Sequence, residues 1–334
     1  MLAAFLFYGK ATAEQSVTVA WYGGNWGDAF NACVAKPFTE TTGITVKPEI
    51  GTSIVTLSKL KQQKGSASID VAWMDGGVSE LAADADLLDT LDSSQIPNLV
   101  NVQPQAIYKS GGSNFAVGTG YYSVGIAYNT EKVKTPPSSW GDLWKPDFAG
   151  AVTIPSPSNS AGIPLLVFLN SVFGASPNEL TPIFDKVKSL QAALFYDSSG
   201  AASTAFQTGE VVAGAHYSAA AWDLAAKGLP IKFVVPKEGV WATDARLHLI
   251  KGSKNKAAAE KFINTALTKE AAHCLAEKLY LGPAVKDVSI DAALAEKMPW
   301  GKGGSVDNLN MSDWSMINKM RPGIVDRWNR EIVK

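Results

Sequence analysis

The chain has 334 residues, of which 46% are hydrophobic and 18% are charged, and its formal net charge is −1. This length exceeds what a single simple core usually serves, so we expect two lobes. The near-neutral charge, with no basic tract, gives nucleic-acid binding no electrostatic support, and we expect no nucleic-acid partner.

The first thirteen residues have the pattern of a secretory signal. An apolar run over 2–8 precedes Ala11-Thr12-Ala13, which has the form of an A-x-A cleavage site. The positively charged start of such signals is missing, and a disordered tail is the alternative. No later run reaches the roughly 20 apolar residues that span a bilayer. We therefore expect export and a soluble mature chain.

Strand and helix patterns alternate in the first third of the chain. An apolar stripe from Phe30 to Phe38 predicts a helix, which Pro37 should bend and Gly43 should end. This order predicts an α/β protein with a mainly parallel sheet covered on both faces. The further elements expected here are strands at 16–22, 44–50 and 69–73 and helices at 53–64 and 78–88.

A crossing segment around 115–129 leads to a second α/β set that begins at Ala151. A final helix over 311–332 is expected to clamp the second lobe. The elements expected between them are helices at 162–173, 178–192, 219–227, 254–267 and 269–278 and strands at 210–217, 231–235 and 245–250.

The two cysteines, Cys33 and Cys274, each lie on a predicted amphipathic helix. A disulfide suits an exported protein, but two separately buried thiols fit the sequence equally well. Neither cysteine belongs to a C-x-x-C motif, and no Cys/His cluster of the metal-binding kind occurs. We expect no metal and no cofactor.

Residues 139–150 read SWGDLWKPDFAG and are followed by AVTIP. This stretch resembles the signature of bacterial extracellular solute-binding proteins of the polyamine-binding group, the capture subunits of ABC importers. The resemblance implies a two-lobed periplasmic-binding-protein fold of the type II kind, hinge closure on a small-molecule ligand, an ABC permease as partner, a monomer and a periplasmic location. We expect one lobe from 14–121 plus 245–285 and the other from 122–244 plus 286–334.

Ligands of open α/β sheets bind at the carboxyl ends of the strands, and three candidate residues lie there. Trp26 and Tyr217 match aromatic positions of the polyamine binders and could form walls or a cation–π face. The alternative is hinge-side packing for Trp26 and core packing for Tyr217. Asp75 follows a strand and could pair with an ammonium group, or it could cap the next helix.

The loop at 156–162 lacks the acidic residues that polyamine binders carry there. Asn159 and Ser160 offer neutral hydrogen bonds instead, unless they only cap a helix. Trp241 and Asp244 lie in a segment that resembles another ligand-binding stretch of that group. Asp244 is shifted by one position, so a bulge would be needed for it to reach an amine. Arg246 would then share its face, to hold a zwitterion or to form a salt bridge.

No catalytic pattern accompanies the three histidines, so an enzyme is not expected. The sequence predicts capture of an amine-bearing solute: a polyamine-like compound, a short amine or an amino-acid-like zwitterion. A ferric-ion or anion carrier of the same fold is a rival, because Tyr121-Tyr122 is an adjacent tyrosine pair. A receptor-coupled sensor is a further alternative.

Overall fold

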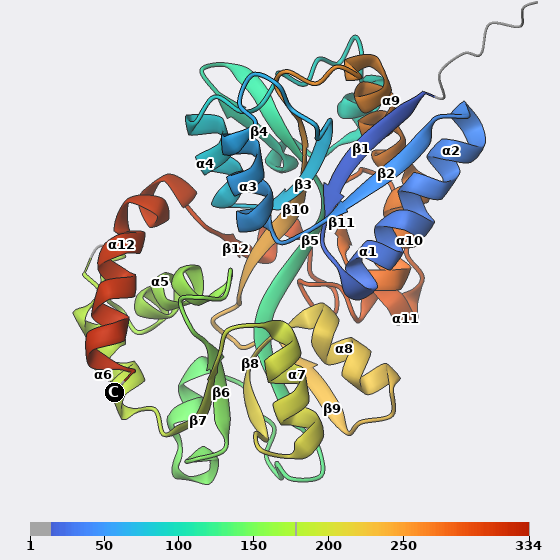
Figure 1. Ribbon diagram of the computed structural model, residues 1–334. Coiled ribbons are helices and arrows are strands. Elements are labelled where there is room, and N and C mark those ends of the chain that lie inside the picture. Colours follow the sequence, from blue (N-terminus) through green and yellow to red (C-terminus); the bar gives the residue numbers. More distant parts are fainter. Residues whose placement is uncertain (1–14, 178, 334) are drawn as a thin grey trace, which may run out of the picture.

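The computed structural model describes residues 15–177 and 179–333, so the expected signal segment at 1–13 lies outside the described residues. Figure 1 shows two lobes, one above the other, joined by the long strands β5 and β10. The α/β architecture and its two-lobed arrangement confirm the predicted fold class.

One mixed sheet runs through both lobes in the order β2-β1-β3-β10-β5-β8-β6-β7. The three strands at each end are mutually parallel, and β10 and β5 join the two sets through antiparallel pairing. The strands are β1 Ser16–Trp21, β2 Thr45–Ile50, β3 Val71–Asp75, β4 Ile107–Ser110, β5 Ser113–Asn129, β6 Val152–Pro155, β7 Ala192–Tyr196, β8 Ala213–Tyr217, β9 Ile231–Val234, β10 Val240–Leu249, β11 Gly282–Pro283 and β12 Leu309–Met311.

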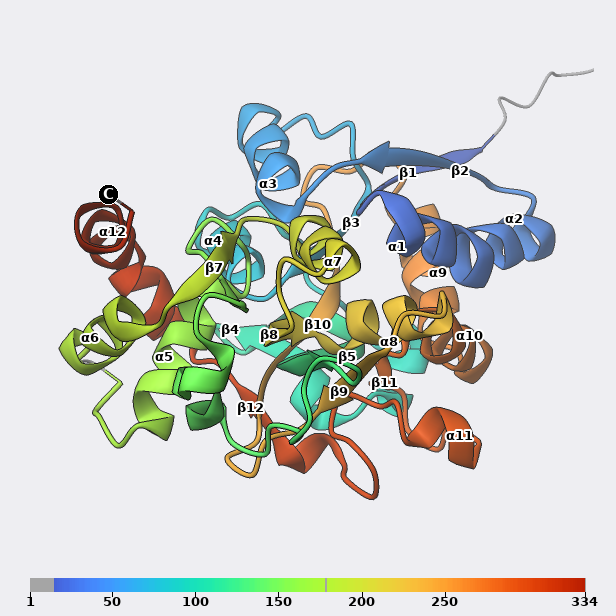
Figure 2. The same ribbon diagram turned by 90° about the horizontal axis from the view of Figure 1, so that it is seen from below.

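Helices cover both faces of this sheet. Figure 2 shows α5, α6 and α12 together on one side of the central strands and α10 and α11 on the other. The helices are α1 Gly24–Phe30, α2 Lys36–Thr42, α3 Ser53–Gln62, α4 Val78–Asp84, α5 Gly162–Val172, α6 Thr181–Ser189, α7 Ser199–Thr208, α8 Ser218–Ala226, α9 Lys256–Ala266, α10 Lys269–Leu279, α11 Ala292–Ala295 and α12 Trp314–Glu331.

The strand β5 passes from one hydrophobic core to the other. Its residues Tyr121 and Tyr122 belong to the core under α1, α9 and α10, whereas Val124 and Ile126 belong to the core under α5, α6 and α12. On β10, Trp241 belongs to the second of these cores, whereas Val240 and Ala242 on either side of it belong to the first. Each lobe therefore has its own core, and two paired strands carry the chain across.

The sequence pattern missed one strand and one helix between α6 and β8. The helix expected at 178–192 stops at Ser189 as α6, and the apolar run that follows it, for which no element was expected, forms β7. The helix α7 follows β7 directly, and Ser198 caps it by accepting a hydrogen bond from Ala201 N at 3.2 Å. A short apolar run fits a strand or a buried helix equally well, so periodicity could not separate the two.

The first helix is interrupted at its middle by a π-helical segment, Asn31–Ala35, between α1 and α2. Pro37 follows that segment, and because proline has no N–H to donate, the regular ladder cannot continue through it. Gly43 ends α2 with φ 71°, in the left-handed conformation, as its position predicted.

Cys33 of the π-helical segment forms a disulfide with Cys274 of α10, at a Cα–Cα distance of 5.6 Å. This settles which of the two arrangements left open by the sequence is present. The bond ties α10 to the first helix across 241 residues of sequence.

We expect the double variant Cys33→Ala, Cys274→Ala to lose about 2–4 kcal/mol of unfolding free energy, because the disulfide restricts the unfolded chain. Urea denaturation with and without a reductant measures this. The wild type under reductant should match the variant; equal stability of oxidised wild type and variant would contradict the prediction.

Two histidines are fully buried on the strands. His216 of β8 lies 3.1 Å from the Ser203 hydroxyl through Nε2, and burial lowers its pKa to about 4. His248 of β10 lies between the Ser79 hydroxyl and the Ala72 carbonyl, and burial lowers its pKa to about 3. Both imidazoles are therefore neutral near pH 7.

Acid should destabilise the fold through these imidazoles. An unfolded histidine titrates near 6.5, above the folded pKa, so its contribution is fully present above about pH 6.5 and is lost as the pH falls toward 4. For His216 the loss between pH 7.5 and 5 is about 2 kcal/mol. Urea denaturation at both pH values should show a drop smaller by about that amount in His216→Phe. An identical drop in variant and wild type would contradict this.

Candidate functional site

Asp75 ends β3, and hydroxyl groups from three other elements surround its carboxylate. Oδ1 accepts hydrogen bonds from Tyr22 Oη at 2.9 Å and Tyr122 Oη at 2.7 Å, and Oδ2 accepts one from Ser53 Oγ at 3.0 Å. Asp75 is half-buried, and no cationic side chain pairs with it among residues 15–177 and 179–333. A partly desolvated carboxylate of this kind is stabilised when a cation joins it.

Asp75 does not cap the helix that follows it, which was the alternative role. Gly77 is the N-cap residue of α4, and its N–H donates to Glu80 Oε2 at 2.5 Å. The carboxylate of Asp75 instead points to the tyrosine and serine hydroxyls. Its side chain therefore has no capping role in α4.

The ring of Trp26 covers one side of the cluster formed by Asp75, Tyr22, Tyr122 and Ser53. Its centroid lies 5.6 Å from that of Tyr22 and 5.5 Å from that of Tyr122, both in edge-on geometry. It also contacts Phe30 edge-on at 5.8 Å and remains half-buried. Electron-rich rings beside a carboxylate suit a cation with an alkyl chain.

Tyr217, at the end of β8, connects this group to the second set of parallel strands. Its ring lies 6.0 Å from that of Tyr122. Its hydroxyl donates to Asn159 Oδ1 at 2.6 Å and lies 3.1 Å from Ser160 Oγ. The structure therefore brings Trp26, Asp75, Tyr217, Asn159 and Ser160 into one network that spans both lobes.

The tyrosines of this network are hydrogen-bond donors at physiological pH. Burial and the Asp75 carboxylate raise the pKa of Tyr22 and of Tyr122 well above the usual value. Burial raises the pKa of Tyr217 as well. The described residues hold no cluster of three or more His, Cys, Asp or Glu side chains arranged for a metal ion.

Asp244 and Trp241 do not join this network. Asp244 has no exposed surface, and its Oδ1 accepts from Arg246 Nε at 2.7 Å. Arg246 also pairs with Glu80 Oε1 at 2.5 Å and stacks over the Tyr108 ring at 3.4 Å. The salt bridge that the sequence offered as an alternative is therefore present.

A register shift between Ala245 and Arg246, in the pairing of β10 with β5, accompanies this ion pair. Trp241 is 2% exposed, donates from Nε1 to Ser312 Oγ at 2.7 Å and packs edge-on against Trp314. Trp241 thus packs in the interior at the start of α12, and Asp244 is buried in its ion pair, so neither lines the network around Asp75.

Three members of the network were not selected from the sequence. Tyr22, Ser53 and Tyr122 all donate hydrogen bonds to Asp75. Tyr22 directly follows β1, Ser53 begins α3 and Tyr122 lies in the crossing strand β5. Asp197 is a fourth residue that the sequence reading missed. It follows the unrecognised strand β7, so no strand-end argument was applied to it.

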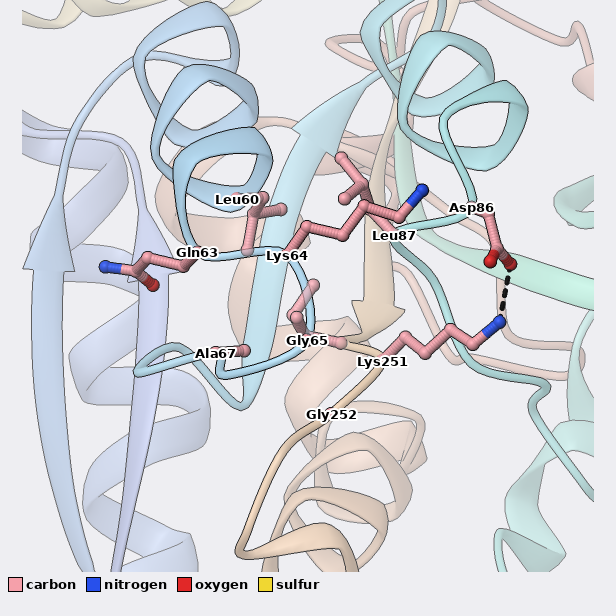
Figure 3. A pocket seen from close by; sticks show the side chains of 10 residues that line it. Leu60, Gln63, Lys64, Gly65, Ala67, Asp86, Leu87, Lys251 and Gly252 are labelled. Carbon is pink, nitrogen blue, oxygen red and sulfur yellow. Dashed lines mark hydrogen bonds and ion pairs between the residues drawn. The ribbon is translucent and has the colours of Figure 1, made fainter.

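A pocket of about 290 Å³ lies elsewhere in the first lobe. Figure 3 shows the side chains that line it. It borders the start of β3 and the end of β10, whereas Asp75 stands at the opposite end of β3. Its charged groups already have partners, because Lys251 pairs with Asp86 at 2.6 Å and Lys64 donates to the Ala85 carbonyl. This pocket is separate from the network around Asp75.

The two lobes with a polar, aromatic network between them define a protein of the periplasmic-binding-protein class. The sequence model of the bacterial extracellular solute-binding protein family matches residues 34–299. The chain belongs to this family, and it is a solute-binding protein rather than an enzyme. No helix of the described residues is long and apolar enough to cross a membrane.

Similar proteins of known sequence and structure agree with this assignment. The spermidine/putrescine-binding periplasmic protein 1 of Haemophilus influenzae is 28% identical, over 91% of this chain and 86% of the relative. The gamma-aminobutyric acid-binding protein of Pseudomonas aeruginosa is 25% identical, over 84% of this chain and 80% of the relative. The crystal structure of an ABC transporter from Clostridium perfringens has a TM-score of 0.78 and 26% identity, covering 95% of this chain and 99% of its own.

Proposed function

We propose that this chain is the periplasmic solute-binding component of an ABC importer and that it captures a small amine-bearing organic solute. The observation that carries the proposal is the carboxylate of Asp75, which is half-buried, lacks a cationic partner among the described residues and receives three hydroxyl donors. An ammonium group of the solute would form an ion pair with this carboxylate.

The aromatic rings supply the rest of the site. Trp26 and Tyr122 would cover the alkyl part of the solute on one side, and Tyr217 would cover it on the other. Asn159 and Ser160 would fix the Tyr217 hydroxyl in place. Two relatives with names that state a ligand, spermidine or putrescine and gamma-aminobutyric acid, also bind amines, which supports this class of solute.

Capture would use movement between the lobes. We place the division at 14–121 plus 245–285 for one lobe and 122–244 plus 286–334 for the other, with β5 and β10 as the hinge strands. Tyr217 then belongs to one lobe and Asp75 to the other, and Tyr122 lies on the hinge strand β5 at the boundary between them. Closure would enclose the amine, and the closed monomer would be the form that the membrane permease engages.

A thermal-shift screen of the purified mature protein tests the proposal. A ligand at 100 times its Kd adds about 2.7 kcal/mol of stability. The panel should contain diamines, polyamines, monoamines, amino acids including gamma-aminobutyric acid, organic phosphates and Fe(III). We expect a shift with amines; a shift only with anions or iron would overturn the proposal.

A further inference from the structure

We infer that Asp197 is a second carboxylate of the same cleft and that it makes the protein prefer a solute with a positive charge at each end. This inference rests on the proposed function and extends it from amines in general to a specificity-determining residue. The loop at 156–162 is free of acids, but the neighbouring strand supplies one.

The sheet places Asp197 at the same edge as the network. The strands β6, β7 and β8 are parallel, and Pro155 at the end of β6 pairs with Tyr196 at the end of β7. Ser156 N continues that ladder by donating to Tyr196 O at 2.9 Å. Asp197 therefore leaves its strand beside Ser156, at the edge where Tyr217 leaves β8.

Two nearly buried side chains hold Asp197 there. Ser156, 5% exposed, donates its hydroxyl to Asp197 Oδ1. Asn159, 7% exposed, donates from Nδ2 to the Asp197 carbonyl at 3.2 Å and accepts the Tyr217 hydroxyl through Oδ1. One amide thus links Asp197 to Tyr217, and Tyr217 is in ring contact with Tyr122, which donates to Asp75.

The charge of Asp197 has no other partner or task among the described residues. Asp197 is exposed, and no Lys or Arg pairs with it anywhere in 15–177 or 179–333. The capping of α7 is carried out by Ser198. The hydrogen bond from Ser156 engages Oδ1, and no donor of the described residues engages Oδ2, so this oxygen is open to a ligand.

The network therefore has a carboxylate at each end, Asp75 and Asp197, with neutral tyrosine, asparagine and serine groups between them. A zwitterion with its ammonium on Asp75 would bring its own carboxylate toward a like charge, which is unfavourable. A diammonium compound meets a complementary charge at both ends. Electrostatic complementarity of this kind determines specificity.

Calorimetric titration with matched pairs of ligands tests the inference. The ligands are α,ω-diamines from 1,3-diaminopropane to 1,6-diaminohexane and the n-alkylamines of the same chain lengths. The variant Asp197→Asn keeps an oxygen for Ser156 and removes only the charge. The control is Asp223→Asn, which removes a carboxylate that pairs with Lys227 on α8 and takes no part in the network.

We expect the wild type to bind its preferred diamine at least about tenfold more tightly than the matched monoamine. Asp197→Asn should weaken diamine binding about tenfold, leave monoamine binding unchanged and so remove the preference, whereas Asp223→Asn should match the wild type. Unchanged diamine affinity in Asp197→Asn, or an equal loss for both ligands, would overturn the inference while leaving the amine proposal standing. If the wild type binds neither diamines nor monoamines, the proposed function fails, and the inference fails with it.

Discussion

Replacing Asp75 with asparagine is expected to weaken amine binding by about 2 kcal/mol or more, which is roughly a 30-fold rise in Kd. The amide can still accept hydrogen bonds from Tyr22, Tyr122 and Ser53, so the site should keep its shape. What disappears is the negative charge that a buried ammonium requires. Calorimetric titration with the best amine of the thermal-shift panel measures the change.

The control for this variant is Asp326→Asn. Asp326 is exposed and pairs with Arg330 across one turn of α12, so its loss should leave Kd unchanged and cost well under 1 kcal/mol of stability. Wild-type affinity in Asp75→Asn, with the fold intact, would show that the amine is held by other groups.

The variant Arg246→Met should lower the unfolding free energy by about 3–5 kcal/mol, because it leaves Asp244 buried without its cation. Arg246 is 1% exposed and joins Asp244 of its own strand to Glu80 of α4. The substitution also removes the stacking contact between the Arg246 guanidinium and the Tyr108 ring. Urea denaturation measures the loss, and amine affinity measured well below the midpoint should stay within about threefold of the wild type.

The matched control is Arg330→Met, since Arg330 forms an exposed pair and is expected to change stability by less than about 1 kcal/mol. The opposite pattern would be an unchanged stability of Arg246→Met together with a large loss of amine affinity. It would indicate that Asp244 and Arg246 bind the ligand. That pattern would contradict the interior role assigned to them here.

The local pattern of apolar and polar residues predicted much of the fold and part of the site. Asp75 and Tyr217 end strands, so they could be selected from the expected strand positions before the structure was known. Trp26 lies in α1, just after β1, and was selected by its match to the polyamine binders. Their partners come from distant segments: Ser53 begins α3 and Tyr122 lies in the crossing strand β5. A single sequence does not show which hydroxyl reaches which carboxylate.

Specific features of the sequence explain why Asp197 was not selected and why Asp244 was expected near the ligand. Asp197 was overlooked because no strand was expected at 192–196, although this run pairs with β6 at the edge of the sheet. Asp244 was placed near the ligand because its segment resembles a ligand-binding stretch. Its burial depends on Arg246, Glu80 and Tyr108, and the last two lie more than 130 residues away in the chain.

The most direct measurement of the central claim is a crystal structure of the protein with the amine that gives the largest thermal shift. We predict an ammonium nitrogen within about 3.2 Å of a carboxylate oxygen of Asp75, with the alkyl chain against Trp26 and Tyr217. An amine bound away from Asp75, or an anion in contact with the Tyr22 and Tyr122 hydroxyls in its place, would contradict the account.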